Sequence, residues 1–286
     1  MTATEKRQRV RKILAGPACV HPGSVHDPIS ARIAEEVGFE LGMFAGSTAS
    51  LTVLGAPDLI VLTLSEFAAQ ARRICRAGNL PLVVDADHGY GNALNAMRTV
   101  EELENAGVAA MSIEDTELPR PYGVPQPRLI PLEEGVGKIR AALAARQDTA
   151  TCILARTGAA GITGPEDTLA RTSAYCATGA DALFLTGVKT RDELDAIAAV
   201  ATLPLVLGTM TPALADRAYL AARGVRIALQ GHQPFQASVQ ALYATLKALR
   251  DGVPPAELPN LAPPALMQRL TREAEYNAAM KTYLGG

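Results

Sequence analysis

The sequence lacks several features that mark particular classes of protein. It contains no tryptophan, only 4% aromatic residues, and four histidines in 286 residues. Because no run of 18 consecutive apolar residues occurs, we expect no membrane-spanning helix. The formal net charge is −2, and no basic patch with interleaved aromatic residues is present, so nucleic acid is not an expected partner.

Cysteine is also scarce, and its spacing gives no sign of a metal site. The four residues Cys19, Cys75, Cys152 and Cys176 form neither a CxxC pair nor a cysteine–histidine ligand pattern. Each stands in an apolar stretch, where a free thiol behaves as a small hydrophobic side chain. The basic stretch at residues 1–14 is not followed by the apolar segment of a secretion signal. We therefore expect a cytoplasmic protein with free thiols.

Eight short runs of β-branched and apolar residues alternate with amphipathic stretches that are long enough for helices. The runs are ACVHPG, LGMFAG, LPLVVDADHG, VAAMSIED, TCILART, DALFLTG, LPLVLGT and VRIALQG. Asp27 followed by Pro28 is typical of a helix start, and Thr190 with Glu193 forms a capping-box pattern. These units predict helices and strands in regular alternation.

Near-continuous apolar strands in eight strand–helix units predict an α/β fold, a parallel (β/α)8 TIM-type barrel, over residues 1–250. An open, doubly wound sheet is less favoured, because no G-x-G-x-x-G follows the first run and no G-x-x-x-x-G-K-[ST] occurs. Residues 251–286 start with a proline-rich segment and then become helical in pattern. They predict a C-terminal helical extension that packs on the barrel or on a neighbouring subunit.

The third run ends in two aspartates one residue apart, in VVDADHGYGN. Alternate residues of a strand point to the same side, so Val83, Asp85 and Asp87 are expected to share one face. Chemistry in the barrel fold collects at the carboxyl ends of the strands, where Glu114 and Asp58 are also expected. Clustered carboxylates without cysteine or histidine favour Mg²⁺, or Mn²⁺, over Zn²⁺.

Other strand ends offer groups that suit an anionic substrate. Arg156 ends the fifth run on an inward face, where it needs a carboxylate partner, either a substrate carboxylate or Glu114. Ser47 follows the second run and can help to hold another carboxylate. His232 ends the eighth run, a position that favours function in this fold. We interpret Asp115 as a turn or capping residue.

Several motifs, taken in order, resemble the phosphoenolpyruvate mutase/isocitrate lyase superfamily and, within it, the bacterial oxaloacetate decarboxylases. The similarity runs over about residues 10–250, and the short motifs ART and GH add to it. The main motifs are DPISARIAEEVGFE, VLGAPD, DADHGYGNALNAMRTVEELENAG, IEDT and EEGVGKIRAAL.

The resemblance implies decarboxylation of oxaloacetate, a 2-oxo dicarboxylic acid, to pyruvate and CO₂ through a metal-stabilised enolate. It implies that Asp85 binds Mg²⁺ directly, and that Asp58, Asp87 and Glu114 hold the ion through water. It also implies that Ser47, Arg156 and His232 contact the substrate, with Arg156 and His232 as catalytic residues. A homotetramer is implied as the assembly.

Departures from the family patterns leave alternatives open. The stretch TELPRPYGVPQPRLIPLEE has none of the lysine, cysteine and histidine residues that the mobile loop of isocitrate lyases carries, which disfavours cleavage by a loop thiol. TGAA, GTMTP and QGH differ from the decarboxylase pattern near the site and leave the substrate open. The alternatives are a lyase or hydrolase acting on another 2-oxo acid such as phosphonopyruvate, a Schiff-base aldolase using Lys189, and a non-catalytic carboxylate-binding barrel.

Overall fold

The structure, a computed structural model, describes residues 1–208 and 210–285. The chain divides into two compact units, Met1–His232 and Gln233–Gly286. All eight strands belong to the first unit, and the second unit is helical.

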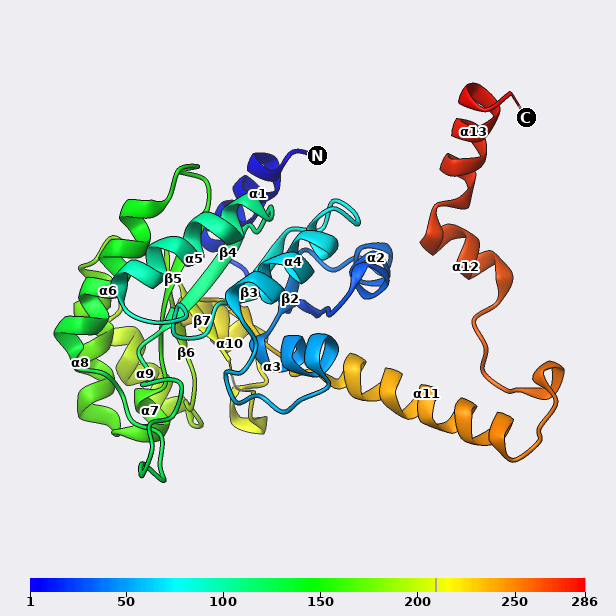
Figure 1. The fold of residues 1–286 in the computed structure, drawn as a ribbon. Helices are drawn as coiled ribbons and strands as arrows, with labels where there is room; N and C mark the ends of the chain where they lie inside the picture. The colour runs from blue at the N-terminus through cyan, green and yellow to red at the C-terminus, as the bar shows by residue number, and fades with distance from the viewer. Residues whose placement is uncertain (209, 286) are drawn as a thin grey trace. The chain divides into compact units, whose positions relative to one another are not determined.

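Eight parallel strands form a single sheet in the order of the chain (Figure 1). A parallel bridge between Val20 and Ile227 joins the segment before the first strand to the last strand. In this bridge the Val20 amide donates to the Arg226 carbonyl at 2.9 Å, and the Ala228 amide donates to the Val20 carbonyl at 3.0 Å. The sheet is therefore curled, in agreement with the predicted TIM-type architecture. The strands are β1 (Gly23–Ser24), β2 (Gly42–Phe44), β3 (Leu82–Asp85), β4 (Ala110–Glu114), β5 (Cys152–Thr157), β6 (Ala182–Leu185), β7 (Leu205–Leu207) and β8 (Val225–Ala228).

The sequence predicted seven of these strands within their runs and misplaced the first. The predicted run at residues 18–23 contributes only the isolated bridge at Val20, and β1 is the two-residue strand Gly23–Ser24. Pro22 explains the difference, because proline has no N–H group to donate to a strand neighbour.

Helices of the first unit surround the curled sheet (Figure 1). The predicted helix starts are confirmed: the Asp27 side chain accepts from the Ser30 amide at 2.7 Å, and the Thr190 hydroxyl accepts from the Glu193 amide at 3.2 Å. The helices are α1 (Ala3–Ala15), α2 (Pro28–Glu36), α3 (Gly46–Ala49), the π-helix η1 (Ser50–Leu54), α4 (Leu64–Cys75), α5 (Ala93–Asn105), α6 (Leu132–Ala145), α7 (Ala159–Ile162), α8 (Pro165–Cys176), α9 (Arg191–Val200), the 3₁₀ helix η2 (Pro212–Leu214) and α10 (Arg217–Ala222).

In the described part of the second unit, one long helix is followed by a 3₁₀ helix and two shorter α-helices. It consists of α11 (Gln233–Arg250), η3 (Pro255–Glu257), α12 (Pro264–Thr271) and α13 (Glu273–Tyr283). Among all helices of the described residues, none combines the length and the apolar character needed to cross a membrane.

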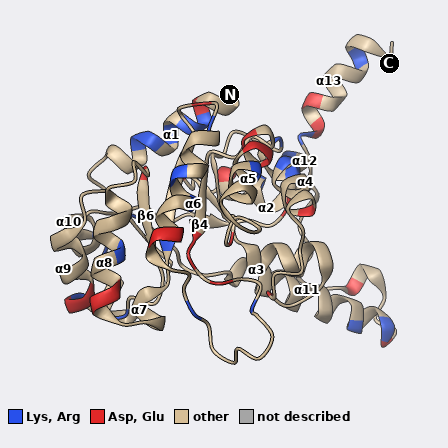
Figure 2. Cartoon of the chain, turned by 60° about the vertical axis from the view of Figure 1, so that its left-hand side comes forward, with Lys and Arg blue, Asp and Glu red and all other residues tan. Residues whose placement is uncertain are grey.

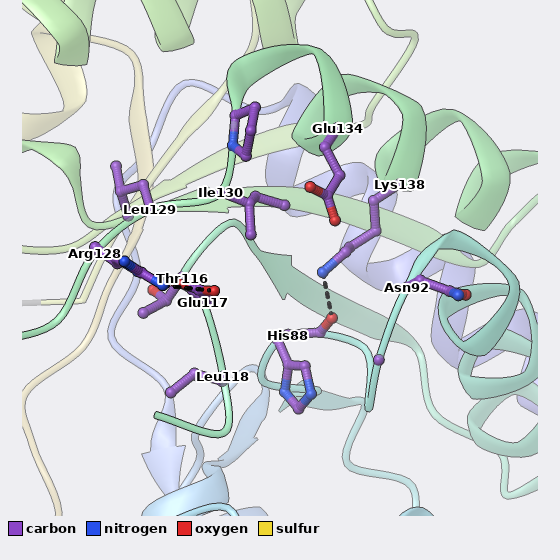
Figure 3. A pocket seen from close by; sticks show the side chains of 12 residues that line it. His88, Asn92, Thr116, Glu117, Leu118, Arg128, Leu129, Ile130, Glu134 and Lys138 are labelled. Carbon is purple, nitrogen blue, oxygen red and sulfur yellow. Dashed lines mark hydrogen bonds and ion pairs between the residues drawn. The ribbon is translucent and has the colours of Figure 1, made fainter. Parts of the chain in front are cut away.

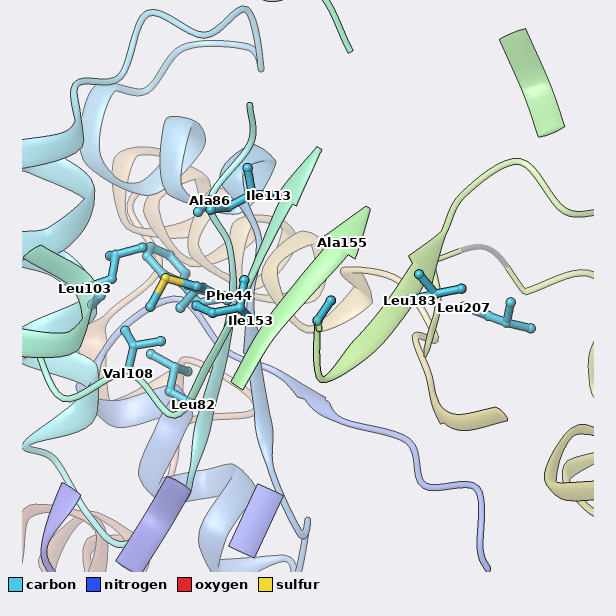
Figure 4. Close-up of a cluster of buried hydrophobic side chains, with 14 of the residues drawn as sticks. Phe44, Leu82, Ala86, Leu103, Val108, Ile113, Ile153, Ala155, Leu183 and Leu207 are labelled. Atoms are coloured by element: carbon cyan, nitrogen blue, oxygen red, sulfur yellow. The ribbon is translucent and has the colours of Figure 1, made fainter. Parts of the chain in front are cut away.

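Alternate strand residues divide the core into two apolar clusters. The outer cluster lies between strands and helices, and Figure 4 shows Phe44, Leu82 and Leu103 among its members. Phe44 stacks on Phe67 with ring centroids 5.0 Å apart. Burying each such large side chain stabilises the fold by roughly 1.5–3 kcal/mol. The inner cluster contains Val83 and Leu154 together with Val10 of α1. Apolar side chains therefore fill the inside of the curled sheet and leave polar groups to the strand ends.

Both basic and acidic residues lie on helices of the first unit (Figure 2). The four cysteines are free thiols, as predicted, and three of them are buried. Burial raises the pKa of the Cys75 thiol to about 12, so this thiol stays protonated and unreactive.

Candidate active site

A cavity of about 460 Å³ lies at the carboxyl ends of the strands. Five of the predicted site residues line it together: Asp58, Asp85, Asp87, Glu114 and Arg156. They come from the loop after η1, from β3 and the turn after it, and from the ends of β4 and β5. The position of the cavity agrees with the place where this fold collects its chemistry.

Arg156 lies between two carboxylates that also line this cavity. Its guanidinium forms an ion pair with Asp85, and its Nη2 lies 3.3 Å from Oε2 of Glu114. Sheet register brings Glu114 and Arg156 opposite each other on β4 and β5. Burial disfavours the charge of Arg156, but the two carboxylates outweigh burial and raise its pKa. The sequence left Glu114 and the substrate as alternative partners of Arg156, and Asp85 was not foreseen.

The carboxylates carry more negative charge than Arg156 can balance. Burial raises the pKa of Asp87 well above its usual value, and the charges of Asp85, Glu114 and Asp58 raise it further. Burial also raises the pKa of Glu114, and the carboxyl of Asp58, on the exposed rim, has its pKa raised by partial burial and by Asp85. Mutual repulsion of this kind favours a bound cation.

Asp87 reaches the cavity by a turn and not by strand alternation. β3 ends at Asp85, and Asp87 follows with φ +48° in the left-handed region. Its amide donates to Oδ1 of Asp85 at 3.1 Å, and its carbonyl accepts from the Glu114 amide at 2.8 Å. The expectation that both aspartates line one site is met, but the reason given for Asp87 was wrong.

Gly46, the first residue of α3, packs directly against this turn. A Cβ atom at Gly46 would lie only 2.6 Å from Oδ1 and 2.8 Å from Oδ2 of Asp87. Glycine is therefore required here for close approach of the backbone to the carboxylate. Ser47, the next residue, is half-buried and does not appear among the residues that line the cavity.

Two hydroxyl groups orient the carboxylates and were not singled out from the sequence. Ser112 donates to Oδ1 of Asp85 at 3.2 Å, and Thr116 donates to Oε2 of Glu114 at 2.9 Å. Such hydrogen bonds fix carboxylate ligands in their sites. The spacing of Ser112, Glu114 and Thr116 at alternate positions was a usable signal for both.

His232 follows β8 and contacts the end of β1. Its Nδ1 lies 2.9 Å from the hydroxyl oxygen of Ser24, another residue that sequence reasoning missed. Burial lowers the pKa of His232, and the charge of Asp85 opposes this by raising it. His232 does not line the cavity itself, but the field of the carboxylate cluster reaches it.

Two other residues considered from the sequence lie outside the cavity. Asp115 turns towards α8, where it accepts from Nη1 of Arg171 at 2.9 Å and from the hydroxyl of Tyr175 at 2.7 Å. Asp115 is therefore a structural residue, but it acts as a buried partner of α8 and not as the turn or capping residue that the sequence predicted. Lys189 is exposed in the connection between β6 and α9 and does not line the cavity, so the structure does not favour a Schiff-base role.

A second cavity, of about 510 Å³, adjoins the first and shares Thr116 and Leu118 with it. Figure 3 shows Nζ of Lys138 donating to the carbonyl of His88 across this cavity, at 2.9 Å. Burial lowers the pKa of His88 to about 4, and the charge of Lys138 acts in the same direction. His88 is therefore neutral near pH 7.

The donor set fits a hard divalent cation better than a structural zinc. Within residues 1–208 and 210–285, no three Asp, Glu, His or Cys side chains stand ready as a metal cage. The carboxylates that line the cavity instead offer oxygen atoms at separate points of its wall. Mg²⁺ suits such a site, since it commonly keeps several waters and takes one or two carboxylates. The stretch GTMTP, one of the departures near the site, includes Thr209, which lies outside the described residues.

Comparison with known proteins places this site in a family. An oxaloacetate decarboxylase of Bradyrhizobium sp. strain BTAi1 is 55% identical over 284 residues, which cover 99% of each chain. Among solved structures, a phosphoenolpyruvate phosphomutase from Streptomyces platensis subsp. rosaceus is 29% identical with a TM-score of 0.85, covering 97% of this chain and 99% of its own. A phosphonopyruvate hydrolase solved with oxalate and Mg²⁺ is 30% identical with a TM-score of 0.84, covering 99% of this chain and 100% of its own.

The family model for phosphoenolpyruvate phosphomutase matches residues 11–250. This range includes all eight strands and every residue that lines the cavity with Arg156 and the four carboxylates. With that match and whole-length relatives at 55% identity, the chain belongs to the phosphoenolpyruvate phosphomutase family, within the phosphoenolpyruvate mutase/isocitrate lyase superfamily.

Proposed function

We propose that this chain is a carboxy-lyase that converts oxaloacetate to pyruvate and CO₂. The observation that carries this proposal is the 55% identity, over whole chains, to relatives named oxaloacetate decarboxylase. The cavity supports it, because acidic groups suited to a cation stand beside a guanidinium suited to a carboxylate. The substrate would be a small 2-oxo dicarboxylic acid.

The proposed cofactor is Mg²⁺, with Mn²⁺ as a substitute. Asp85 would bind the ion directly, and Asp58, Asp87 and Glu114 would hold it through water. Support comes from the oxygen-only donor set and from the phosphonopyruvate hydrolase solved with Mg²⁺ and oxalate. When bound, the ion supplies a Lewis acid for the negative charge that develops on the 2-oxo group as CO₂ leaves.

The other residues would bind and orient the substrate. Arg156, held in place by Asp85 and Glu114, would anchor one carboxylate, and Ser47 would hold another. His232 would orient the carboxylate that leaves or help to deliver a proton to the carbon that loses it. None of these steps needs a covalent bond between the protein and the substrate.

We also propose the finer architecture and the assembly. Residues 1–250 would form the predicted (β/α)8 barrel, with residues 251–286 as a helical extension packed on it or on a neighbouring subunit. Val239, Leu242 and Leu246 of α11 are 50–60% exposed along one helical face, which favours burial in a homo-oligomer, with the tetramer as our proposal. Sedimentation would test this assembly. Free cysteines favour a cytoplasmic location.

A substrate panel tests the reaction. Oxaloacetate, phosphonopyruvate and 2-methylisocitrate are assayed with Mg²⁺ and with excess EDTA. We expect turnover of oxaloacetate alone, loss of that turnover in EDTA, and recovery with added Mg²⁺ or Mn²⁺. Asp85→Ala should remove most of the activity, whereas Asp192→Ala, a change of an exposed aspartate on α9, should leave it intact.

The outcomes separate the parts of the proposal. Preferred turnover of phosphonopyruvate would keep the metal site and overturn the substrate, while full activity in EDTA would overturn the cofactor. Oxalate resembles the planar dianion that forms during the reaction, so it should inhibit more strongly than pyruvate. Metal binding without turnover of any of the three acids would indicate a non-catalytic barrel.

A further inference from the structure

Ser24 and His232 stand 208 residues apart in the chain and meet at one hydrogen bond. Ser24 is the last residue of β1, and His232 lies shortly after β8. The hydroxyl oxygen of Ser24 lies 2.9 Å from Nδ1 of His232, and both side chains are half-buried. No step of the proposed reaction assigns a role to this serine.

The contact closes the junction between the first and last strands on the side of the cavity. Further back along the junction, Val20 bridges to Ile227, and Nδ1 of His21 lies 2.7 Å from the carbonyl oxygen of Ala228. Three contacts thus join residues 20–24 to β8 and to the residues just after it. The imidazole of His232 therefore contacts a segment that is itself bonded to β8, although His232 follows the end of that strand.

A neutral imidazole carries one proton, and the partner of one nitrogen decides which nitrogen carries it. A serine hydroxyl can donate to a bare Nδ1, which leaves the N–H on Nε2, the nitrogen on the far side of the ring. A carboxylate in the cavity accepts hydrogen bonds and cannot donate them when ionised. Only the Nε2–H form can therefore donate to a substrate carboxylate from that side.

We propose that Ser24 is a positioning residue that holds His232 in the Nε2–H form and directs this N–H to the substrate carboxylate. The tautomer rests on the Ser24–His232 contact, while its role in binding rests on the proposed function. Ser24 does not touch the substrate in this scheme. It acts through the orientation and the proton of His232.

Nitrogen NMR of the Mg²⁺-loaded full chain tests the tautomer directly. In a ¹⁵N-labelled sample at a pH where His232 is neutral, protonated and bare ring nitrogens resonate in separate ranges. His21 is the internal reference, because the carbonyl of Ala228 only accepts and so requires a proton on Nδ1 of His21. A His232→Gln variant assigns the His232 signals. We expect His232 and His21 to show opposite protonation.

Three serine variants separate positioning from general stability. Ser24→Ala should mix the two tautomers of His232, raise the Michaelis constant for oxaloacetate, and lower kcat/KM by about tenfold or more. Ser24→Thr keeps the hydroxyl and should restore both the tautomer and the kinetics. Ser173→Ala, on the exposed side of α8, is the matched control and should change neither.

The outcomes distinguish this inference from the proposed reaction. An Nδ1–H form in the parent protein, or an unchanged tautomer and unchanged kinetics in Ser24→Ala, would overturn the role of Ser24. A fall in melting temperature with both readouts unchanged would likewise overturn it and leave a purely structural serine. If the parent chain does not turn over oxaloacetate, the proposed function fails, and the NMR signals still decide the tautomer.

Discussion

Replacing Gly46 with alanine should damage the proposed metal site without removing any carboxylate. The backbone of Gly46 is not in the left-handed region, so alanine can adopt its conformation. The added methyl group would lie 2.6 Å from Oδ1 of Asp87, where an ordinary contact begins near 3.4 Å. The carboxylate must therefore move by about 0.8 Å, because the neighbouring backbone of α3 is less free to shift.

The magnitude follows from the proposed role of Asp87 as a holder of metal-bound water. Loss of such an outer contact costs about 10- to 100-fold in metal affinity or activity. Overpacking of a buried site costs a further 1–3 kcal/mol or so in the free energy of unfolding. We therefore expect the Mg²⁺ concentration for half-maximal activity to rise at least tenfold in Gly46→Ala, with a lower melting temperature.

Gly137→Ala is the matched control for this variant. Gly137 lies in α6, and an added Cβ atom meets nothing within 4 Å there. The same change should leave the Mg²⁺ requirement unaltered and stabilise the helix by roughly 0.5–1 kcal/mol. Titration of activity with Mg²⁺, together with thermal melts, compares the two variants. An unchanged Mg²⁺ requirement in Gly46→Ala would refute the reasoning.

Two further predictions concern stability. Burial would raise the pKa of Asp148, but hydrogen bonds from Arg7, the Ala150 amide and Thr4 outweigh it and lower the pKa to about 2. The ionised Asp148 carboxylate therefore contributes on the order of 1 kcal/mol to the free energy of unfolding, after solvent screening. This contribution is present above about pH 4 and is lost as the pH falls towards 2. Urea unfolding should therefore show Asp148→Asn less stable than the parent at pH 6, with the gap closing in acid; a constant gap would contradict this. Tyr175→Phe removes the buried hydrogen bond to Asp115 and should lower the free energy of unfolding by about 1.5–3 kcal/mol. The control Tyr122→Phe, at a fully exposed site, should leave the free energy of unfolding unchanged. Equal effects of the two variants in urea unfolding would be inconsistent with the Tyr175–Asp115 contact.

Features that depend on near neighbours in the chain were predicted well. The caps at Asp27 and Thr190 form within three residues, so the local sequence contains the whole interaction. The position of Glu114 at a strand end and the inward phase of Arg156 were also predicted correctly, because both residues remain within the regular strands β4 and β5. The sheet then brings them together by register.

Features that depend on irregular backbone or distant contacts were not predictable in the same way. Asp87 lies beyond the end of β3, and its left-handed turn is no part of the period-two pattern that was used to place it. Ser24 belongs to a two-residue strand, too short for any alternation, and its partner His232 comes 208 residues later. The pairing of Arg156 with Asp85 joins strands that are not adjacent, β5 and β3, so no register argument could supply it.

The junction between β1 and β8 has a consequence for synthesis of the chain. During translation every residue that lines the cavity emerges before β8, so a nascent chain holds the carboxylates and Arg156 while the strand that pairs with Val20 is still missing. The backbone beside Val20 then remains an unpaired strand edge, which is a template for association with other chains. A chain cut short before Val225 would keep that edge permanently, together with a charged cluster that lacks its histidine. Such a fragment should aggregate, and the cell would gain no partial activity from it.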